Sequence, residues 1–156
     1  MFKKWINVLV KPVETFRKEK NNSDSAEAVK MLAAAGVIAG IIYAAGFTFF
    51  DLPMLSFGSH GPGERALYGL VMILFMPLSA IIHVFMLSVL LYLFANFSGR
   101  KVNLTTQTYL IALFASPLMI IYMSAFILPC GAVIAVITIM YFIYLLILVL
   151  RETHRQ

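Results

Sequence analysis

Few side chains in this 156-residue sequence could do chemistry, and His83 is the most prominent of them. It lies inside a long apolar run, where an ionisable group is costly and is a candidate for metal binding or proton transfer. Either role needs partners, because metals need several ligands and proton transfer needs a second titratable group. The apolar runs hold no Asp, Glu, Lys, Arg or second His. A neutral imidazole bonded to a carbonyl or a nearby serine is therefore the simpler interpretation.

The other reactive residue types do not form a catalytic set. Cys130 is the single cysteine, which excludes a disulfide within the chain and a zinc cluster. Nucleophilic catalysis needs a Ser or Cys beside a base, yet His60 and His154 lie at opposite ends of the expected topology. The sequence also holds no glycine-rich phosphate loop and no paired-histidine helix motif. We therefore expect no enzymatic activity, no metal and no cofactor.

The elements that must position these residues are membrane-embedded helices. Hydrophobic residues make up 62% of the sequence and charged residues 12%, whereas a soluble domain is about half apolar and about a quarter charged. Of the charges, eleven lie in the first thirty residues and three in the last six. Basic residues that flank apolar runs meet anionic headgroups. We therefore expect a bilayer with anionic headgroups as partner, and no nucleic acid.

Four apolar runs predict an all-α, polytopic transmembrane helix bundle, since about 20 apolar residues cross a hydrocarbon core of ~30 Å. Residues 31–50, 106–126 and 132–150 each predict one span. As one helix, the run 66–97 would be about 48 Å long. It is either one span kinked at Pro77, with 78–97 as its full-length part, or a hairpin at Pro77 that makes five spans. Pro117 is expected to kink the third span.

The segments around the spans complete the expected organisation. Residues 51–64 contain two prolines and three glycines and predict a loop between spans. Residues 1–22 form a basic amphipathic segment, and residues 23–156 form a single transmembrane domain. With four crossings, eleven Lys and Arg residues share the side of both termini and only Arg65 lies opposite, whereas five crossings divide these twelve residues much more evenly. Cytoplasmic loops are rich in Lys and Arg, so we favour four crossings with both termini cytoplasmic.

The N-terminal segment carries apolar residues at helical spacing, with lysines on the other side. The apolar residues are Phe2, Trp5, Ile6, Leu9, Val13 and Phe16, and the lysines are Lys4, Lys11 and Lys18. This pattern predicts a helix in the headgroup plane, with Trp5 and Phe16 at the acyl boundary and the lysines on anionic lipid. The alternative is a helix packed against the membrane domain. Pro12 predicts either a kink or a new helix that starts there.

Small residues recur every four positions in the first span, at Gly36, Gly40 and Ala44. This pattern lets two helix backbones approach closely. The face could bind a second copy or a protein partner, or it could be filled by another helix of the same chain. A bundle of four helices needs such internal contacts, which favours the second interpretation.

Several short motifs carry a resemblance to a known family. They are Ser98-Gly99-Arg100-Lys101, residues 105–109, Ala115-Ser116-Pro117, the last span ending near Leu150 with His154 beyond it, and the N-terminal residues 11–16. In these motifs the sequence resembles the Yip family of membrane proteins, named for interaction with Ypt/Rab-type GTPases. The resemblance implies a compact helical membrane domain without catalytic machinery, usually described with five spans, and eukaryotic relatives act in vesicle traffic. Without a long acidic region, the chain is similar to prokaryotic members.

These observations lead to one expected function and one alternative. We expect a non-enzymatic membrane protein of the Yip type, in a prokaryotic cell membrane, that organises the membrane or binds a partner. The alternative is a small oligomeric channel or transporter lined by polar residues such as Thr138, Tyr141 and Tyr144. A continuous polar path through the spans would favour that alternative, because solutes need hydrogen-bonding groups along their route.

Overall fold

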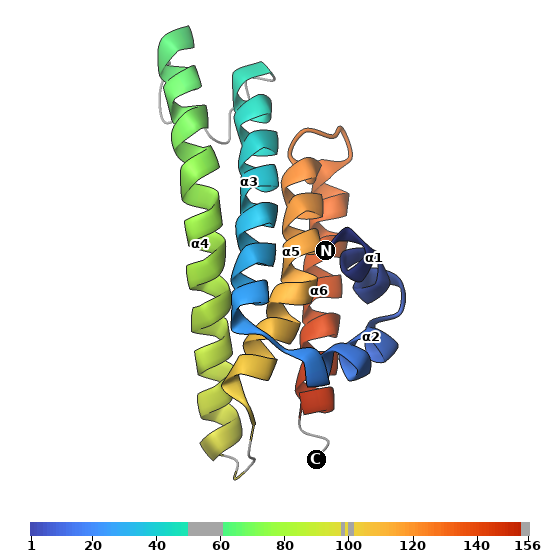
Figure 1. Cartoon of the computed structure of the whole chain (residues 1–156). Helices are drawn as coiled ribbons and strands as arrows, with labels where there is room; N and C mark the ends of the chain where they lie inside the picture. Colours follow the sequence, from blue (N-terminus) through green and yellow to red (C-terminus); the bar gives the residue numbers. More distant parts are fainter. Residues whose placement is uncertain (50–60, 98, 100–101, 154–156) are drawn as a thin grey trace.

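The computed structural model describes residues 1–49, 61–97, 99 and 102–153, and every element within these ranges is helical. Four long helices stand side by side, and two short helices lie against them (Figure 1). The elements are α1 (Phe2–Val10), α2 (Pro12–Glu19), the 3-10 turn η1 (Lys20–Asn22), α3 (Ser25–Phe49), α4 (Pro62–Phe97), α5 (Leu104–Ala125) and α6 (Gly131–Thr153). In the described part of the chain, α3 to α6 are long and apolar enough to cross a membrane. The predicted all-α transmembrane bundle is confirmed.

Helix α4 decides between the two predictions for residues 66–97. It runs unbroken for 36 residues through Pro77, a length of about 54 Å at 1.5 Å per residue. The alternative of a hairpin at Pro77, with five spans, is therefore wrong. Helix α5 likewise continues through Pro117. Both prolines are tolerated because neighbouring groups in a bundle compensate for the lost backbone hydrogen bond. The loop predicted over 51–64 lies mostly outside the described residues, and α4 already begins at Pro62.

Local sequence signals explain where the helices start. Pro12 begins a new helix at its first position, so the second of its two predicted outcomes is confirmed. Asp24 caps α3, since its carboxylate accepts a hydrogen bond from the backbone N–H of Ala26 at 2.9 Å. Asn103 caps α5 in the same way, accepting from Thr105 N–H at 2.9 Å. The polar residues between the apolar runs thus fix the helix ends.

The small residues of α3 pack against α4 of the same chain. A Cβ atom added to Gly36 would overlap the backbone of Pro77, and one added to Gly40 would lie 2.7 Å from the Cα atom of Ile73. Ala44 lines a hollow between the same two helices. At Gly36 and Gly40, the structure therefore agrees with the interpretation that another helix of the same chain fills this face. Self-association through these two glycines is wrong, because α4 already fills the space.

Helix α5 lies at the centre of the core, between α3, α4 and α6. Seven consecutive residues in it, Tyr109 to Ala115, are buried. The Phe114 ring packs edge-on against Phe142 of α6, with centroids 5.2 Å apart, and against Phe16 of α2 at 6.2 Å. The outward faces of α4 and α6 instead expose large apolar side chains such as Leu74 and Met140. Such faces suit lipid, which is as apolar as the side chains themselves.

Candidate functional site

The N-terminal segment is docked on the bundle, with α1 against α5 and α2 against α6 (Figure 1). Trp5, Val8 and Phe16 are buried in the same core as α5. The prediction that Trp5 and Phe16 face the acyl boundary is therefore wrong, and the alternative of packing against the membrane domain describes them. A helical apolar stripe fits lipid and a protein groove equally well, because both are apolar. The periodicity alone could not separate the two.

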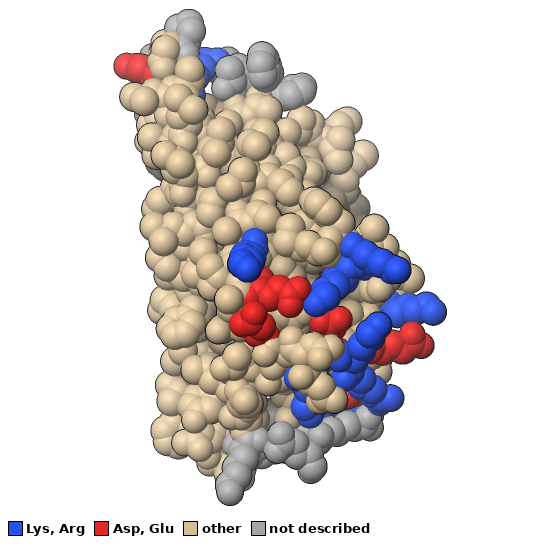
Figure 2. Space-filling view, viewed as in Figure 1, with Lys and Arg blue, Asp and Glu red and all other residues tan. Residues whose placement is uncertain are grey.

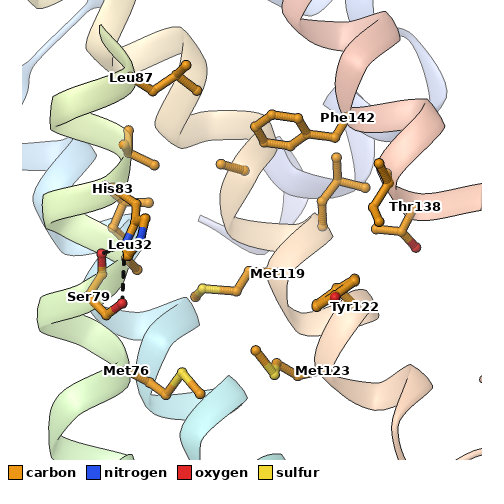
Figure 3. A pocket seen from close by; sticks show the side chains of 15 residues that line it. Leu32, Met76, Ser79, His83, Leu87, Met119, Tyr122, Met123, Thr138 and Phe142 are labelled. Atoms are coloured by element: carbon orange, nitrogen blue, oxygen red, sulfur yellow. Dashed lines mark hydrogen bonds between the residues drawn. The ribbon is translucent and has the colours of Figure 1, made fainter. Parts of the chain in front are cut away.

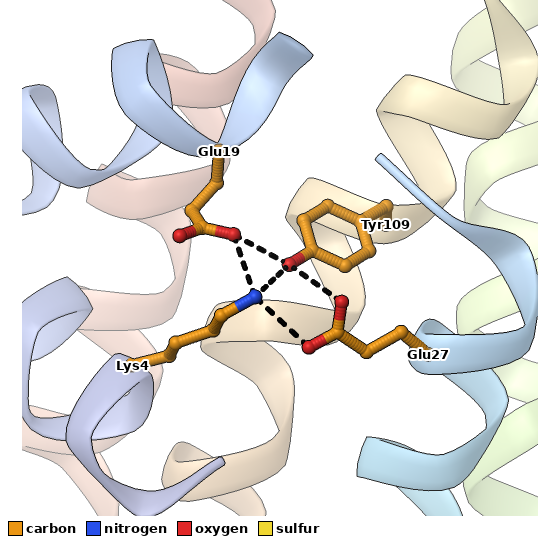
Figure 4. Close-up of polar contacts among 4 residues, drawn as sticks. All are labelled: Lys4, Glu19, Glu27 and Tyr109. Carbon is orange, nitrogen blue, oxygen red and sulfur yellow. Dashed lines mark hydrogen bonds and ion pairs between the residues drawn. The ribbon is translucent and has the colours of Figure 1, made fainter. Parts of the chain in front are cut away.

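Four polar side chains converge where α1, α2, α3 and α5 meet (Figure 4), and we call Lys4, Glu19, Glu27 and Tyr109 the polar cluster. The ammonium of Lys4 lies 2.8 Å from a Glu19 carboxylate oxygen, 2.9 Å from one of Glu27, and 3.0 Å from the Tyr109 hydroxyl. The Tyr109 hydroxyl donates to Glu19 at 2.7 Å. An ammonium has three N–H donors. Each donor of Lys4 therefore has an acceptor on a different helix.

The polar cluster changes the titration of its two residues outside the spans. Burial opposes the charge of Lys4, but its hydrogen bonds to Glu19, Tyr109 and Glu27 outweigh that effect and raise the pKa of Lys4 above its usual value. Burial would also raise the pKa of Glu19, yet the bonds from Lys4 and Tyr109 lower it below its usual value. Both groups therefore stay charged at neutral pH, and the ion pair is the stable form.

Further polar contacts fasten the N-terminal segment along its length. Arg17 pairs with Glu152 at the end of α6 at 3.2 Å, and Lys20 donates to the Glu152 backbone carbonyl at 3.0 Å. Close to the end of α1, the Tyr141 hydroxyl donates to the Leu9 carbonyl at 2.6 Å. Each contact joins residues more than 130 positions apart in the chain. The segment is thus tied to α6 at two places in addition to the polar cluster.

The three lysines that were predicted to face the membrane surface differ in their surroundings. Lys11 and Lys18 are exposed, which agrees with their predicted position at the headgroups. Lys4 lies in the polar cluster instead, so its assignment to the membrane surface is wrong. Figure 2 shows the charged side chains gathered mainly on one part of the visible face, while much of the rest is uncharged. The roles of Glu19, Glu27 and Tyr109 were not predicted from the sequence, since no local spacing links positions so far apart.

His83 lies on a second feature, a groove between α4, α5 and α6 with a volume of about 350 Å³, which we call the lateral groove (Figure 3). Its walls come from α4 and α6, and α5 lies between them. Most of the lining is apolar; the polar side chains are Ser79, His83, Tyr122 and Thr138. Three methionines, Met76, Met119 and Met123, also line it. The groove is therefore an apolar site with a few polar groups.

The polar side chains of the spans mostly bond within their own helices. Ser116 donates to the Ala112 carbonyl at 2.7 Å, and Thr138 donates to the Ile134 carbonyl at 2.7 Å. The Nδ1 atom of His83 lies 2.7 Å from the Ser79 carbonyl oxygen. This is the carbonyl partner that the simpler interpretation of His83 predicts. Among the described residues, no three His, Cys, Asp or Glu side chains gather as a metal site would require.

The fold and these features define an integral membrane protein with several helices of spanning length. Residues 6–156 match the family model described as the Yip1 domain, so the chain belongs to this family. The resemblance drawn from the short motifs is thereby confirmed. No curated protein and no solved structure gives a significant match to the chain.

Proposed function

We propose that this Yip1-family chain is a non-enzymatic membrane organiser whose docked N-terminal segment widens it within one leaflet. One observation carries the proposal: α1 is apolar on two faces. Its inner face packs on the bundle, while Phe2, Ile6 and Val10 are 62%, 63% and 70% exposed on its outer face. They are spaced four residues apart and so form one stripe. Because exposed apolar stripes favour lipid contact, α1 adds lateral area beside α5 and α6.

The charges near α1 support its placement in the cytoplasmic leaflet. Lys11, which follows Val10 in the chain, and Lys18 of α2 are exposed, and each basic residue near an anionic surface contributes about 1 kcal/mol of attraction. The excess of Lys and Arg on the side of both termini favours the same leaflet. An apolar stripe with neighbouring lysines is typical of interfacial helices. We therefore propose that both termini are cytoplasmic and that the widened part lies in the inner leaflet.

The bonding of the span hydroxyl groups favours an organiser over a channel. Ser88, Ser116, Ser124 and Thr138 each donate to a carbonyl of their own helix. A solute pathway needs polar groups that are free to replace hydration, and these hydroxyl protons are already engaged. Tyr141, one of the side chains considered for a channel lining, donates to α1. The described spans therefore offer little to conduct a hydrophilic solute.

Reconstitution of the purified full-length protein tests this proposal. The protein is placed in vesicles that contain anionic lipid and an entrapped fluorescent solute, and vesicle size, shape and solute release are measured together. We expect smaller or deformed vesicles without release. Replacing Ile6 and Val10 by serine removes the outer apolar stripe and should abolish the deformation. Asn7→Ser exchanges one exposed polar side chain of α1 for another and removes neither apolar surface nor charge, so it is the matched control and should retain the deformation.

Two results would contradict the proposal. Equal deformation by the parent and the serine variant would show that the outer stripe of α1 does not act on the leaflet. Release of the entrapped solute that depends on the protein would instead favour the channel or transporter alternative. Docking of α1 in the variants is checked by protection of the buried Val8 position, so that loss of the stripe is separated from loss of the helix.

A further inference from the structure

The lateral groove extends along about half the thickness of the hydrocarbon core of a bilayer. Along α4 its lining extends from Met76 to Leu87, which is about 16 Å at 1.5 Å per residue. This is about half of the ~30 Å hydrocarbon core. A helix from a second copy would need a contact surface along more of the span. The volume of about 350 Å³ lies at the lower end of the range for small-ligand sites.

The lining favours an uncharged, apolar occupant. Among the described residues that line the groove, none is Lys, Arg, Asp or Glu, so a phosphate headgroup would find no charged partner among them. Three methionines line the groove on α4 and α5 (Figure 3). Methionine side chains are unbranched and flexible, and they adapt to occupants of irregular shape. A flexible hydrocarbon chain meets these conditions.

His83 adds one specific polar group to this apolar lining. A carbonyl oxygen can only accept a hydrogen bond, so the 2.7 Å contact with Ser79 assigns the proton of the neutral imidazole to Nδ1. The other ring nitrogen, Nε2, is then an acceptor. Among the described residues, nothing donates to Nε2. The groove therefore offers an acceptor to an occupant that carries a hydrogen-bond donor.

The register of α3 and α4 gives the depth of His83. Gly36 lies against Pro77 and Gly40 against Ile73, and the two helices run in opposite directions. Counting along this register places His83 level with Lys30, where α3 passes from charged to apolar residues. Leu32 lines the groove together with His83, which agrees with this count. His83 is thus level with the start of the apolar part of α3, while α4 itself continues mostly apolar to Phe97. From His83 the groove extends along α4 toward Met76.

We propose that the lateral groove binds a neutral lipid with one free hydroxyl group, of the diacylglycerol type. The hydroxyl donates to Nε2 of His83, and one acyl chain lies along Met76, Met119 and Met123. This site is independent of the proposed action of α1 on the leaflet. The groove lies between α4 and α6, whereas α1 packs against α5.

Photocrosslinking in nanodiscs tests this site with the full-length protein. The probe is a diacylglycerol with a photoreactive group in one acyl chain, and the labelled peptides are mapped by mass spectrometry. We expect labels in the groove-lining parts of α4 and α5, near 76–87 and 115–123. Unlabelled diacylglycerol should compete at about one fifth of the concentration of its O-acetylated counterpart, because one uncharged hydrogen bond contributes about 1 kcal/mol.

Variants at His83 separate the hydrogen bond from the shape of the groove. His83→Phe removes the acceptor and should abolish the preference for the free hydroxyl, while His83→Gln keeps an acceptor oxygen and should retain part of it. Met86→Phe is the matched control, since Met86 is 60% exposed on the same helix and does not line the groove. It should leave competition unchanged. His83 is itself exposed, so these variants are expected to fold.

Three outcomes would overturn the proposal. The first is labelling spread evenly over the exposed faces of α4 and α6. The second is equal competition by the free and acetylated lipids in the parent protein. The third is crosslinking between two chains through the groove with exclusion of the probe, which would make a second copy the occupant.

Discussion

The polar cluster gives the sharpest prediction, because Lys4 can be changed without altering the shape of α1 much. Lys4→Met keeps a long unbranched side chain and removes the ammonium. Glu19, whose side chain is 8% exposed, then keeps a charge with Tyr109 as its donor in the cluster. Removing one partner of a fully buried ion pair costs about 3–5 kcal/mol. Since the Lys4 side chain is 32% exposed, we expect a smaller cost, about 2–3 kcal/mol, because solvent screens an exposed pair.

This cost should affect the docking of the N-terminal segment rather than the spans. Val8 is fully buried on the inner face of α1. A cysteine at this position therefore reports undocking of α1 by its rate of maleimide labelling. The native Cys130 is exposed and is first replaced by serine. If labelling follows the undocked population, a destabilisation of about 2–3 kcal/mol corresponds to labelling about 30- to 150-fold faster. Trypsin cleavage after Arg17, in α2 of the same segment, should accelerate in parallel.

Two matched variants define what would refute this reasoning. Lys11→Met removes an exposed lysine, 3.9 Å from Glu14, and should change the labelling rate less than about twofold, since exposed pairs contribute little. Adding Glu19→Gln to Lys4→Met removes the unpaired charge and should restore part of the protection. An unchanged labelling rate in Lys4→Met would show that the polar cluster does not hold the segment.

Three further predictions concern pH, packing and topology. The pKa of Glu19 is lowered and that of Lys4 is raised, so docking should weaken below Glu19's ordinary value of 4.5 and above Lys4's ordinary value of 10.5. The measurement is the fluorescence emission maximum of Trp5, the single tryptophan, which is buried when α1 is docked, and a flat profile across either limit would contradict the role of that group. Gly36→Leu should lower the temperature of thermal unfolding through a clash with the α4 backbone, a loss of about 1–3 kcal/mol, and unchanged unfolding would disprove that contact. In intact cells, an impermeant thiol reagent should label Cys130, and a cysteine at Lys11 should stay protected; the reverse pattern would place the termini outside.

The arrangement of the spans could be predicted because membranes constrain helices strongly. The lengths of the apolar runs predicted the four helices that are long enough to span a membrane, and the ends of these helices lie close to the predicted boundaries. The small residues at Gly36 and Gly40 correctly indicated a close contact, since backbones approach only where side chains are absent. The choice at Pro77 could not be made from composition, because a proline within a bundle is compatible with a turn and with a continuous helix.

The polar cluster could not be predicted from local spacing. Lys4 and Tyr109 are 105 positions apart, and only the folded bundle brings their helices together. Lys4 was predicted to lie at the headgroups because the periodicity of residues 1–22 shows only which residues share a helix face, and not which helix packs there. The lateral groove was also missed, although His83 was singled out, since a groove depends on how far α4 and α6 stand from each other. Pairwise packing of distant helices is information that periodicity does not contain.

The polar cluster also explains how α1 selects which of its faces meets lipid. Trp5 and Val8 on one face and Ile6 and Val10 on the other are all apolar. Lipid and protein interiors attract such faces about equally, so apolar contact alone would leave the rotation of α1 poorly specified. Lys4 removes this ambiguity, because it finds three acceptors only when the face that carries Trp5 is turned inward. A buried ion pair often contributes little net stability. Its contribution here is to exclude the rotated arrangement, which would leave Lys4 and Glu19 without each other.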